Sequence, residues 1–370
     1  MKSSYRKEDV EILLKDITGL VEPLPTQVRE ARIQSGLHYC EMLPLEYRPS
    51  ETYLETYQNA LKNYTAATAF AVCKLAEKLY LKKGNSLTVV SLARAGIPIG
   101  ILVKRYLKNK YKLSIDHYAI SIIRGRGIDR NAVDFILQCH APDSIQFVDG
   151  WIGKGAILTQ LREALADYPM LDAELGVLSD PAGLTNLCGT HEDILIPSSC
   201  LNATVTGLIS RTFLREDVIR PGEFHGAVYY KELEEEDLSE SFLAAIESRF
   251  VYDSVSLARL GDALADSCID DMMDLNNMNG KKSGIETVKR IAKAYGIKDM
   301  NLIKPGIGEA TRVLLRRVPW KIIVNQYFAE SDELNHIYQL AAEKAVPCEI
   351  SRVPLGNYKV CGLIQQLADL

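Results

Sequence analysis

The sequence predicts an α/β protein: a parallel sheet with helices on both faces, followed by a second, smaller α/β unit. Two observations lead to this fold class. Short apolar segments rich in β-branched residues alternate with amphipathic stretches, and strands that are apolar along their whole length are typical of parallel sheets buried on both faces. A polar segment with the composition of a linker, LNNMNGKKSG, then separates this pattern from a shorter one of the same kind.

The individual elements follow from the spacing of the apolar residues. In the first unit we expect a long helix over 51–83, a helical region over 239–274, strands near 87–92, 118–123, 145–148, 175–178 and 194–196, and helices near 98–107, 156–166 and 203–214. In the second unit we expect helices at 285–295, 309–317, 332–343 and 359–368 and strands at 321–325 and 347–350. The predicted domains are therefore 1–274, including an N-terminal extension, and 285–370, joined by a linker over 275–284.

Composition and charge narrow the class of protein. The 370 residues are 47% hydrophobic and 25% charged, which is ordinary for a globular protein. The net charge of −5 gives no general attraction to nucleic acid, so such binding needs a local basic patch. The eight cysteines form no CxxC pair, which argues against a zinc site and for a reducing compartment. With a polar start and no long apolar run, a cytoplasmic protein without membrane contact is expected, and a homo-oligomer is compatible with the sequence.

The segment 144–155, SIQFVDGWIGKG, carries the strongest functional signal. Asp149 ends a predicted strand, and a loop containing Gly150, Gly153, Lys154 and Gly155 leads into a predicted helix. Such a loop can hold a phosphate with backbone N–H groups and the helix N-terminus, while the acid binds ribose hydroxyls. The alternative is an ordinary turn in which Asp149 caps the helix.

Two further loops follow predicted strands and have chemistry that suits anions. Arg94, Ala95 and Gly96 lie at a sharp turn before a helix, where an anion would bind. Arg124 and Arg126 alternate with glycines in a loop that would close over a polyphosphate. The alternatives are a βα turn with a surface arginine and a solvated basic loop. Together, the three loops predict a site for 5-phosphoribosyl 1-pyrophosphate (PRPP), with Mg²⁺ bridging its pyrophosphate.

The three segments resemble those of type I phosphoribosyltransferases. SLARAGIPIG resembles the pyrophosphate loop, and FVDGWIGKGA resembles the PRPP motif, although the second acid of that motif is Gly150 here and its threonines are replaced. The resemblance implies a type I phosphoribosyltransferase-like parallel sheet. It implies catalytic roles for Arg94, Asp149, Arg124 and Arg126, and PRPP binding by Ala95, Gly96, Gly150, Gly153, Lys154 and Gly155.

Longer stretches at 33–47, 178–214 and 223–230 resemble the StiP family, which is found in bacterial stress and tellurium-resistance gene clusters. This resemblance implies a phosphoribosyltransferase-like enzyme, acting on a nucleoside-like metabolite and fused to a PELOTA-type RNA-binding domain. Two alternatives stay open. One is a non-catalytic, nucleotide-sensing RNA-binding protein, and the other is a cysteine peptidase.

The peptidase alternative centres on Cys200, which lies between a predicted strand and a predicted helix. A helix N-terminus can lower the pKa of a thiol. His225 or His191 would serve as the base, and Asp193 or Asn202 would orient it. Cys200 is otherwise a half-buried structural cysteine. The same segment would then line the acceptor side of a phosphoribosyl site through Asp180, Asn202, Ser210 and Arg211.

The second unit contains LIKPGIGEATRVLLRR at 302–317, a glycine loop that enters a basic amphipathic helix. Such a loop is suited to phosphate-backbone contacts with RNA, although a plain basic helix would look the same. The segment resembles the G-x-N-E-x-x-K motif of the kink-turn-binding ribosomal protein class, with Gly308 in place of the asparagine. The resemblance implies an α-β-α sandwich and RNA contacts by Lys304, Gly306, Gly308, Glu309, Arg312 and Arg316.

Overall fold

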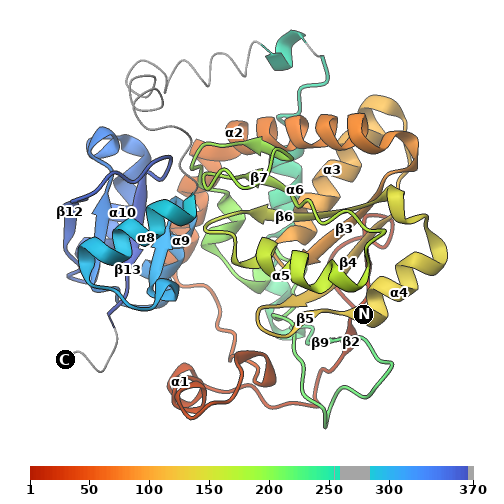
Figure 1. Ribbon diagram of the computed structural model, residues 1–370, viewed down its shortest axis with the longest axis horizontal. Helices are drawn as coiled ribbons and strands as arrows, with labels where there is room; N and C mark the ends of the chain where they lie inside the picture. Colours follow the sequence, from red (N-terminus) through yellow and green to blue (C-terminus); the bar gives the residue numbers. More distant parts are fainter. Residues whose placement is uncertain (254, 259–283, 366–370) are drawn as a thin grey trace.

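A mostly parallel sheet forms the centre of the first unit in the computed structural model, which describes residues 1–253, 255–258 and 284–365 (Figure 1). Its strand order is β1 (Glu11–Ile12), β4 (His117–Ile123), β3 (Thr88–Ala93), β6 (Ile145–Trp151), β7 (Gly176–Ser179) and β8 (Cys188–Thr190). These neighbours are all parallel, and the short β5 (Gly127–Ile128) runs antiparallel to β4. The α/β class with a mainly parallel sheet is therefore confirmed.

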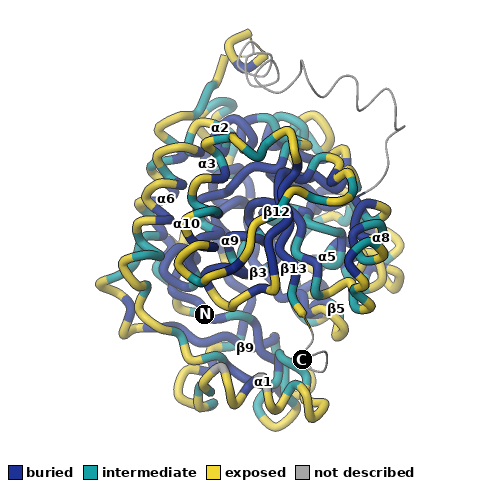
Figure 2. The backbone as a smooth tube through the Cα atoms, turned by 90° about the vertical axis from the view of Figure 1, so that its left-hand side faces the viewer, coloured by how far each residue is buried: buried dark blue, intermediate teal, exposed yellow. Residues whose placement is uncertain are grey.

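Helices cover both faces of this sheet because successive strand residues point to opposite sides. Val148 packs in the cluster of α2 (Glu51–Lys83), α3 (Gly96–Tyr111) and α6 (Ser239–Glu247). Phe147, one residue earlier, packs in the cluster of α4 (Arg130–Cys139) and α5 (Ala156–Ala164). Figure 2 shows the resulting pattern, in which buried strands lie inside helices whose outer sides are exposed.

The N-terminal segment packs against the loops of the first unit. It contains α1 (Thr26–Gln34) and β2 (Lys15–Asp16), which pairs in parallel with β9 (Gly226–Ala227). A third apolar cluster, including Ile17, Leu43 and Phe213, lies beneath this pair. The first unit also contains short 3-10 turns at Tyr39–Glu41, Gly84–Ser86, Pro142–Ser144, Leu165–Asp167, Pro197–Cys200, Ala203–Val205 and Lys231–Glu236.

The second unit has a four-stranded mixed sheet in the order β10 (Ile303–Pro305), β13 (Val360–Leu363), β11 (Lys321–Val324) and β12 (Cys348–Ile350). Its sheet lies between α8 (Gly284–Tyr295) on one face and α9 (Ile307–Arg316) with α10 (Asn335–Glu343) on the other. Short 3-10 turns at Met300–Leu302, Gln326–Phe328 and Asp332–Leu334 complete it. The described part of the unit is thus layered α-β-α.

The helix α2 contacts both units (Figure 1). Toward its start, the Tyr53 hydroxyl donates to Leu315 O, and the Tyr64 hydroxyl donates to Glu333 O at 3.0 Å. Toward its end it packs on the first sheet, where a Cβ on Gly189 would collide with the backbone of Ala71. Although α2 has 33 residues, no helix in the described ranges is long and apolar enough to cross a membrane.

Three predicted elements are wrong. The strand expected at 194–196 is absent, and β8 takes its place earlier in the chain. The helix expected at 203–214 is reduced to a 3-10 turn, because Gly207 and Leu208 both adopt positive φ and end it. The helix expected at 359–368 begins as β13, which pairs with both β10 and β11.

Other expectations fall partly outside the described residues. The linker at 275–284 lies outside them except for Gly284, which begins α8. Of the helical region expected at 239–274, α6 covers the first part and ends at Glu247. The positions 259–274 are not described. The helices α1 and α4 were not anticipated from the sequence.

Candidate functional site

A cavity of about 290 Å³ lies between the carboxyl end of β6 and the second unit. The first unit contributes Ala95, Arg124, Asp149 and the loop from Gly153 to Gly155, and the second contributes Lys304, Glu309 and Arg312. The structure thus brings together many residues predicted separately for the phosphate loops and for the RNA motif. Their individual roles remain predictions.

Burial shifts the pKa values of two ionisable side chains that line this cavity. Burial raises the pKa of Asp149 to about 7, opposed by the Gly150 N–H that donates to its Oδ1 at 2.8 Å and by the charge of Arg312. Burial, together with the neighbouring charge of Lys304, lowers the pKa of Lys154 to about 8. The Lys154 ammonium donates to Met300 O at 2.6 Å and Ile303 O at 3.1 Å. It therefore anchors the glycine loop to the second unit.

The arginines of the Arg-Gly loop have different surroundings. Arg124 lines the cavity and donates to Asn301 Oδ1 at 3.1 Å. Arg126 does not line it, and its guanidinium pairs with Glu41 at 2.6 Å. The backbone N–H of Arg124 donates to the Tyr39 hydroxyl at 3.0 Å. The loop is thus fastened to the N-terminal segment, and Arg126 serves that attachment in this structure.

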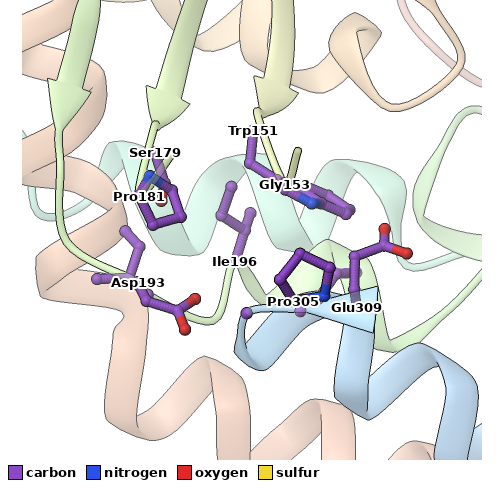
Figure 3. Close-up of a pocket in the computed structure, with 12 residues that line it drawn as sticks. Trp151, Gly153, Ser179, Pro181, Asp193, Ile196, Pro305 and Glu309 are labelled. Atoms are coloured by element: carbon purple, nitrogen blue, oxygen red, sulfur yellow. The ribbon is translucent and has the colours of Figure 1, made fainter. Parts of the chain in front are cut away.

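The glycines of the predicted RNA motif face the first unit. The N–H of Ile307, at the start of α9, donates to Asp193 Oδ1 at 2.9 Å, and the N–H of Lys359 donates to Oδ2 at 2.9 Å. Figure 3 shows Asp193 beside the loop that enters α9, with Trp151 and Glu309 nearby. A carboxylate therefore occupies the helix N-terminus that was expected to face phosphate. The assignment of Gly306 and Gly308 to RNA contacts stays a prediction.

The structure does not bring Cys200 and His225 together. Cys200 is the last residue of a 3-10 turn, is 2% exposed, and has a thiol pKa raised to about 12 by burial. His225 Nδ1 lies 2.8 Å from Ser121 Oγ, and the His225 backbone N–H donates to Asp129. Among the described residues, no hydrogen bond joins Cys200 to an imidazole. The expected helix that would activate this thiol is also missing.

A different thiol lies beside His191. The sulfur of Cys188, the first residue of β8, is 3.5 Å from His191 Nε2, and His191 Nδ1 is 3.0 Å from Asp180 O. The Asp180 carboxylate is buried, and its Oδ2 lies 3.8 Å from Nδ1. Its Oδ2 accepts from the N–H groups of Leu184 and Thr185. Its Oδ1 has no hydrogen-bond partner among the described residues.

A second thiol–imidazole contact joins Cys40 and His38. The Cys40 sulfur lies 2.9 Å from His38 Nδ1 and donates to Leu214 O at 3.6 Å. Burial raises the pKa of Cys40 to about 11 and lowers that of His38. Of the two contacts, the one with Cys188 is distinguished by a carboxylate oxygen within 4 Å of the imidazole, as far as the described residues extend.

Sequence reasoning proposed His191 as a base for Cys200, whereas the structure places its imidazole beside Cys188. The signal was present as Cys-Gly-Thr-His at 188–191, where thiol and imidazole are three residues apart. This spacing becomes meaningful only because the chain turns at the end of β8, which returns His191 toward Asp180 and Cys188. The absence of a strand at 194–196 was equally hidden.

Comparison with known proteins gives two family matches. Residues 3–247 match the family model described as "Tellurite-like stress resistance cysteine protease StiP". Residues 282–366 match the PELOTA RNA binding domain. A relative named "Cysteine protease StiP", from Acinetobacter baylyi (strain ATCC 33305 / BD413 / ADP1), is 33% identical over 377 residues, which cover 98% of this chain and 94% of the relative.

These matches define a two-part class of protein. A region that matches a family described as a cysteine protease precedes a region that matches an RNA-binding domain. The chain belongs to the StiP family, as its resemblance indicated. The prediction of a PRPP-dependent transferase is wrong, because the family and the relative are both described as cysteine proteases. These descriptions favour the peptidase alternative and leave PRPP as a ligand without support. The expectation of Mg²⁺ depended on that ligand.

Proposed function

We propose that this protein is a cysteine peptidase in which Cys188 is the nucleophile, His191 the general base and Asp180 the group that orients the base. One observation carries the choice of residues: thiol, imidazole and carboxylate lie next to one another, with the sulfur 3.5 Å from Nε2 and 3.7 Å from Nδ1, and with Nδ1 3.8 Å from the carboxylate oxygen Oδ2. The protease description of the family supports the reaction class. This order of groups is the one that activates thiols in cysteine peptidases.

The proposed reaction starts from a neutral imidazole. When His191 Nδ1 donates its hydrogen to Asp180 O, Nε2 carries the lone pair, and the Cys188 sulfur lies 3.5 Å from Nε2 and 3.7 Å from Nδ1. The thiol proton moves to Nε2, and the sulfur attacks the carbonyl carbon of a peptide. The C–N bond breaks as the leaving amine takes the proton from Nε2, and water then hydrolyses the thioester. The nearby carboxylate stabilises the imidazolium that exists between these steps.

The resting state of this thiol determines how it is activated. Cys188 is 1% exposed, and burial raises its pKa to about 11, although the charge of Lys78 opposes that rise. At neutral pH the thiol is therefore protonated and depends on His191 to accept its proton. Because the sulfur is buried, a peptide reaches it only when the surrounding residues move, and alkylation of the native thiol is therefore expected to be slow.

Single substitutions in the full-length chain test this proposal. We expect Cys188→Ala and His191→Ala to lower the cleavage of casein by about 10³-fold or more, because each removes a member of the reacting unit. Cys40→Ala and Cys200→Ala are matched controls with equally buried thiols and should retain activity. Loss of activity in Cys40→Ala with retention in Cys188→Ala would move the nucleophile to the other thiol–imidazole pair. A wild-type chain that cleaves no protein would contradict the peptidase itself.

We propose RNA binding by the second unit as a further function. The match to the PELOTA RNA binding domain favours it, as do three cations on β10 and α9: Lys304, Arg312 and Arg316. Phosphate contacts by such residues make binding weaken steeply with salt. Binding of a labelled oligoribonucleotide at two salt concentrations tests this function. Affinity that does not change with salt would contradict it.

The finer architecture is also a proposal. A type I phosphoribosyltransferase-like fold for the first unit concerns its fold alone, and its support is the parallel strand order β4-β3-β6-β7. Domain boundaries at 274 and 285 are compatible with the two family matches, which leave 248–281 unmatched between them. Limited proteolysis followed by mass spectrometry of the fragments would test these boundaries.

A further inference from the structure

Four arginines from both units gather where the loop after β3 meets α9. Arg94 donates to Ile209 O at 3.0 Å and to Asn202 Oδ1 at 3.3 Å. Arg316, on α9, donates to the same Asn202 oxygen. Two guanidiniums from opposite sides of the interface therefore share one neutral acceptor, which leaves most of their N–H groups available to a ligand.

The charges of this cluster are only partly balanced by protein acids. Burial and the charge of Arg94 lower the pKa of Arg211 to about 10. Burial and the charge of Arg312 lower the pKa of Arg316, although its side chain reaches solvent. Glu46 is the acid that acts on both groups, and Glu309 pairs with Arg312 at 3.6 Å. Within the described residues, Arg211 makes no ion pair or side-chain hydrogen bond, so an outside anion would relieve real repulsion.

A buried hydroxyl beside the cluster supplies an independent observation. Tyr230 is 2% exposed, and its hydroxyl has no hydrogen-bond partner among the described residues. The charged groups that act on it are Glu46, Arg94, Arg211 and Glu232. Buried hydroxyls are normally hydrogen-bonded, so an orphaned one near the guanidinium of Arg211 indicates a missing acceptor. A bound anion would provide it.

We propose that Arg94, Arg211, Arg312 and Arg316, with the Tyr230 hydroxyl, form a binding site for phosphate groups. Guanidiniums bind phosphate through paired N–H donors, and the several acceptor oxygens of phosphate groups suit this cluster better than one carboxylate does. Arg312 and Arg316 lie on α9, so the phosphate source that the geometry favours is an RNA backbone crossing from the second unit to the first. In naming RNA, this inference rests on the RNA-binding proposal, whereas the phosphate site itself does not.

The position of Asp193 explains why phosphate would bind along the side of α9. The N-terminus of that helix, the usual place for an anion, already carries the Asp193 carboxylate. Positive charge on α9 then lies toward its other end, at Arg312 and Arg316, where the arginines of the first unit approach it. The first unit thus adds two phosphate contacts that an isolated RNA-binding domain would lack.

Two probes of the full-length chain test the site. The first is a fluorescent oligouridylate followed by anisotropy, and the second is inorganic phosphate at constant ionic strength followed by thermal unfolding. We expect Arg94→Gln/Arg211→Gln to weaken oligouridylate binding by at least about tenfold and to reduce the slope of log K against log salt by about 1.4, or about 0.7 for each lost charge. Arg162→Gln, an exposed arginine on α5, is the matched control and should change neither.

A third variant, Tyr230→Phe, distinguishes loss of the site from loss of folding. It removes an unpaired hydroxyl, so the unliganded protein should be as stable as wild type while the stabilisation by phosphate falls severalfold. If the arginine variants lose both oligouridylate binding and stabilisation by phosphate, the result supports the phosphate site and RNA as its ligand. Stabilisation by phosphate without oligouridylate binding supports the site for small phosphate esters and contradicts the RNA-binding proposal.

Two results would overturn the inference. If the arginine variants bind oligouridylate and respond to phosphate as wild type does, the cluster is not a phosphate site, and RNA binding by other residues still stands. If wild type responds to neither probe, the site and the RNA-binding proposal both fail.

Discussion

Two carboxylates at the interface of the two units, Asp193 and Asp149, have opposite surroundings. Asp193 is 3% exposed and accepts hydrogen bonds from the backbone N–H groups of Ile307 and Lys359. Asp149 accepts from its neighbour Gly150 and faces the cavity that Arg312 also lines. The first carboxylate is used to hold the units together, whereas the second remains available to a ligand.

The pKa values of the two groups reflect this difference. Burial raises both, to about 6 for Asp193 and to about 7 for Asp149. The additional N–H donors of Asp193 favour its charged form and offset more of the cost of burial. Residue type and burial alone therefore do not identify a functional carboxylate, and the identity of its donors does. Three predictions test this comparison.

The largest effect is expected for Asp193→Ala. The change leaves the N–H groups of Ile307 and Lys359 buried without acceptors, and each orphaned donor costs about 1–3 kcal/mol. We expect the free energy of unfolding to fall by about 3–5 kcal/mol, measured by urea denaturation. Asp332→Ala removes an exposed acid and is the control. A loss below about 1 kcal/mol would mean that Asp193 does not hold the interface.

A smaller effect is expected from a matched pair of glycines near Asp193. Gly306 has φ +92° and its Cβ would lie 2.9 Å from Asp193 Oδ1, whereas a Cβ on Gly308 would meet nothing closer than 3.8 Å. Gly306→Ala should destabilise the protein by about 1–3 kcal/mol because it strains the backbone and displaces the carboxylate. Gly308→Ala should change stability by less than about 0.5 kcal/mol. Equal thermal unfolding of the two variants would contradict this explanation.

The smallest effect, opposite in sign, is expected for Asp149→Asn. The raised pKa means that the stability associated with the protonated carboxyl is complete below pH 3.8, declines as the pH rises and is lost above about pH 7. Asparagine stays neutral, so the variant should match wild type near pH 4 and unfold about 2–4 °C higher near pH 8. A stabilisation that is the same at both pH values would show that ionisation of Asp149 is not its cause.

The sequence was informative where structure depends on local pattern. The apolar runs of β3, β4 and β6 and the spacing of α2 predicted these elements with nearly the observed bounds. The final segment was misread because its apolar spacing fits a helix, yet pairing with β10 and β11 makes it a strand. Tertiary pairing of this kind is not encoded in local spacing.

The candidate sites show the same limit. Asp149 and Lys154 could be assigned to one loop from the sequence. The partners of Asp193, in contrast, lie 114 and 166 residues away, so its role depends on how α9 docks. Cys188 and His191 are close in sequence, but their relation to Asp180 depends on the turn that follows β8. The hydrogen bond of Arg316 to Asn202 likewise requires both units to be in place.

The long helix α2 has a consequence for synthesis of the chain. Tyr53 finds its partner carbonyl 262 residues later, and Tyr64 finds its partner 269 residues later. At translation rates of about 5–20 residues per second, these tyrosines leave the ribosome roughly 10–50 s before the second unit exists to cover them. During that interval the start of α2 is an exposed, partly apolar surface on a nascent protein. Chaperone contact and early aggregation are therefore expected to concentrate on this half of the helix.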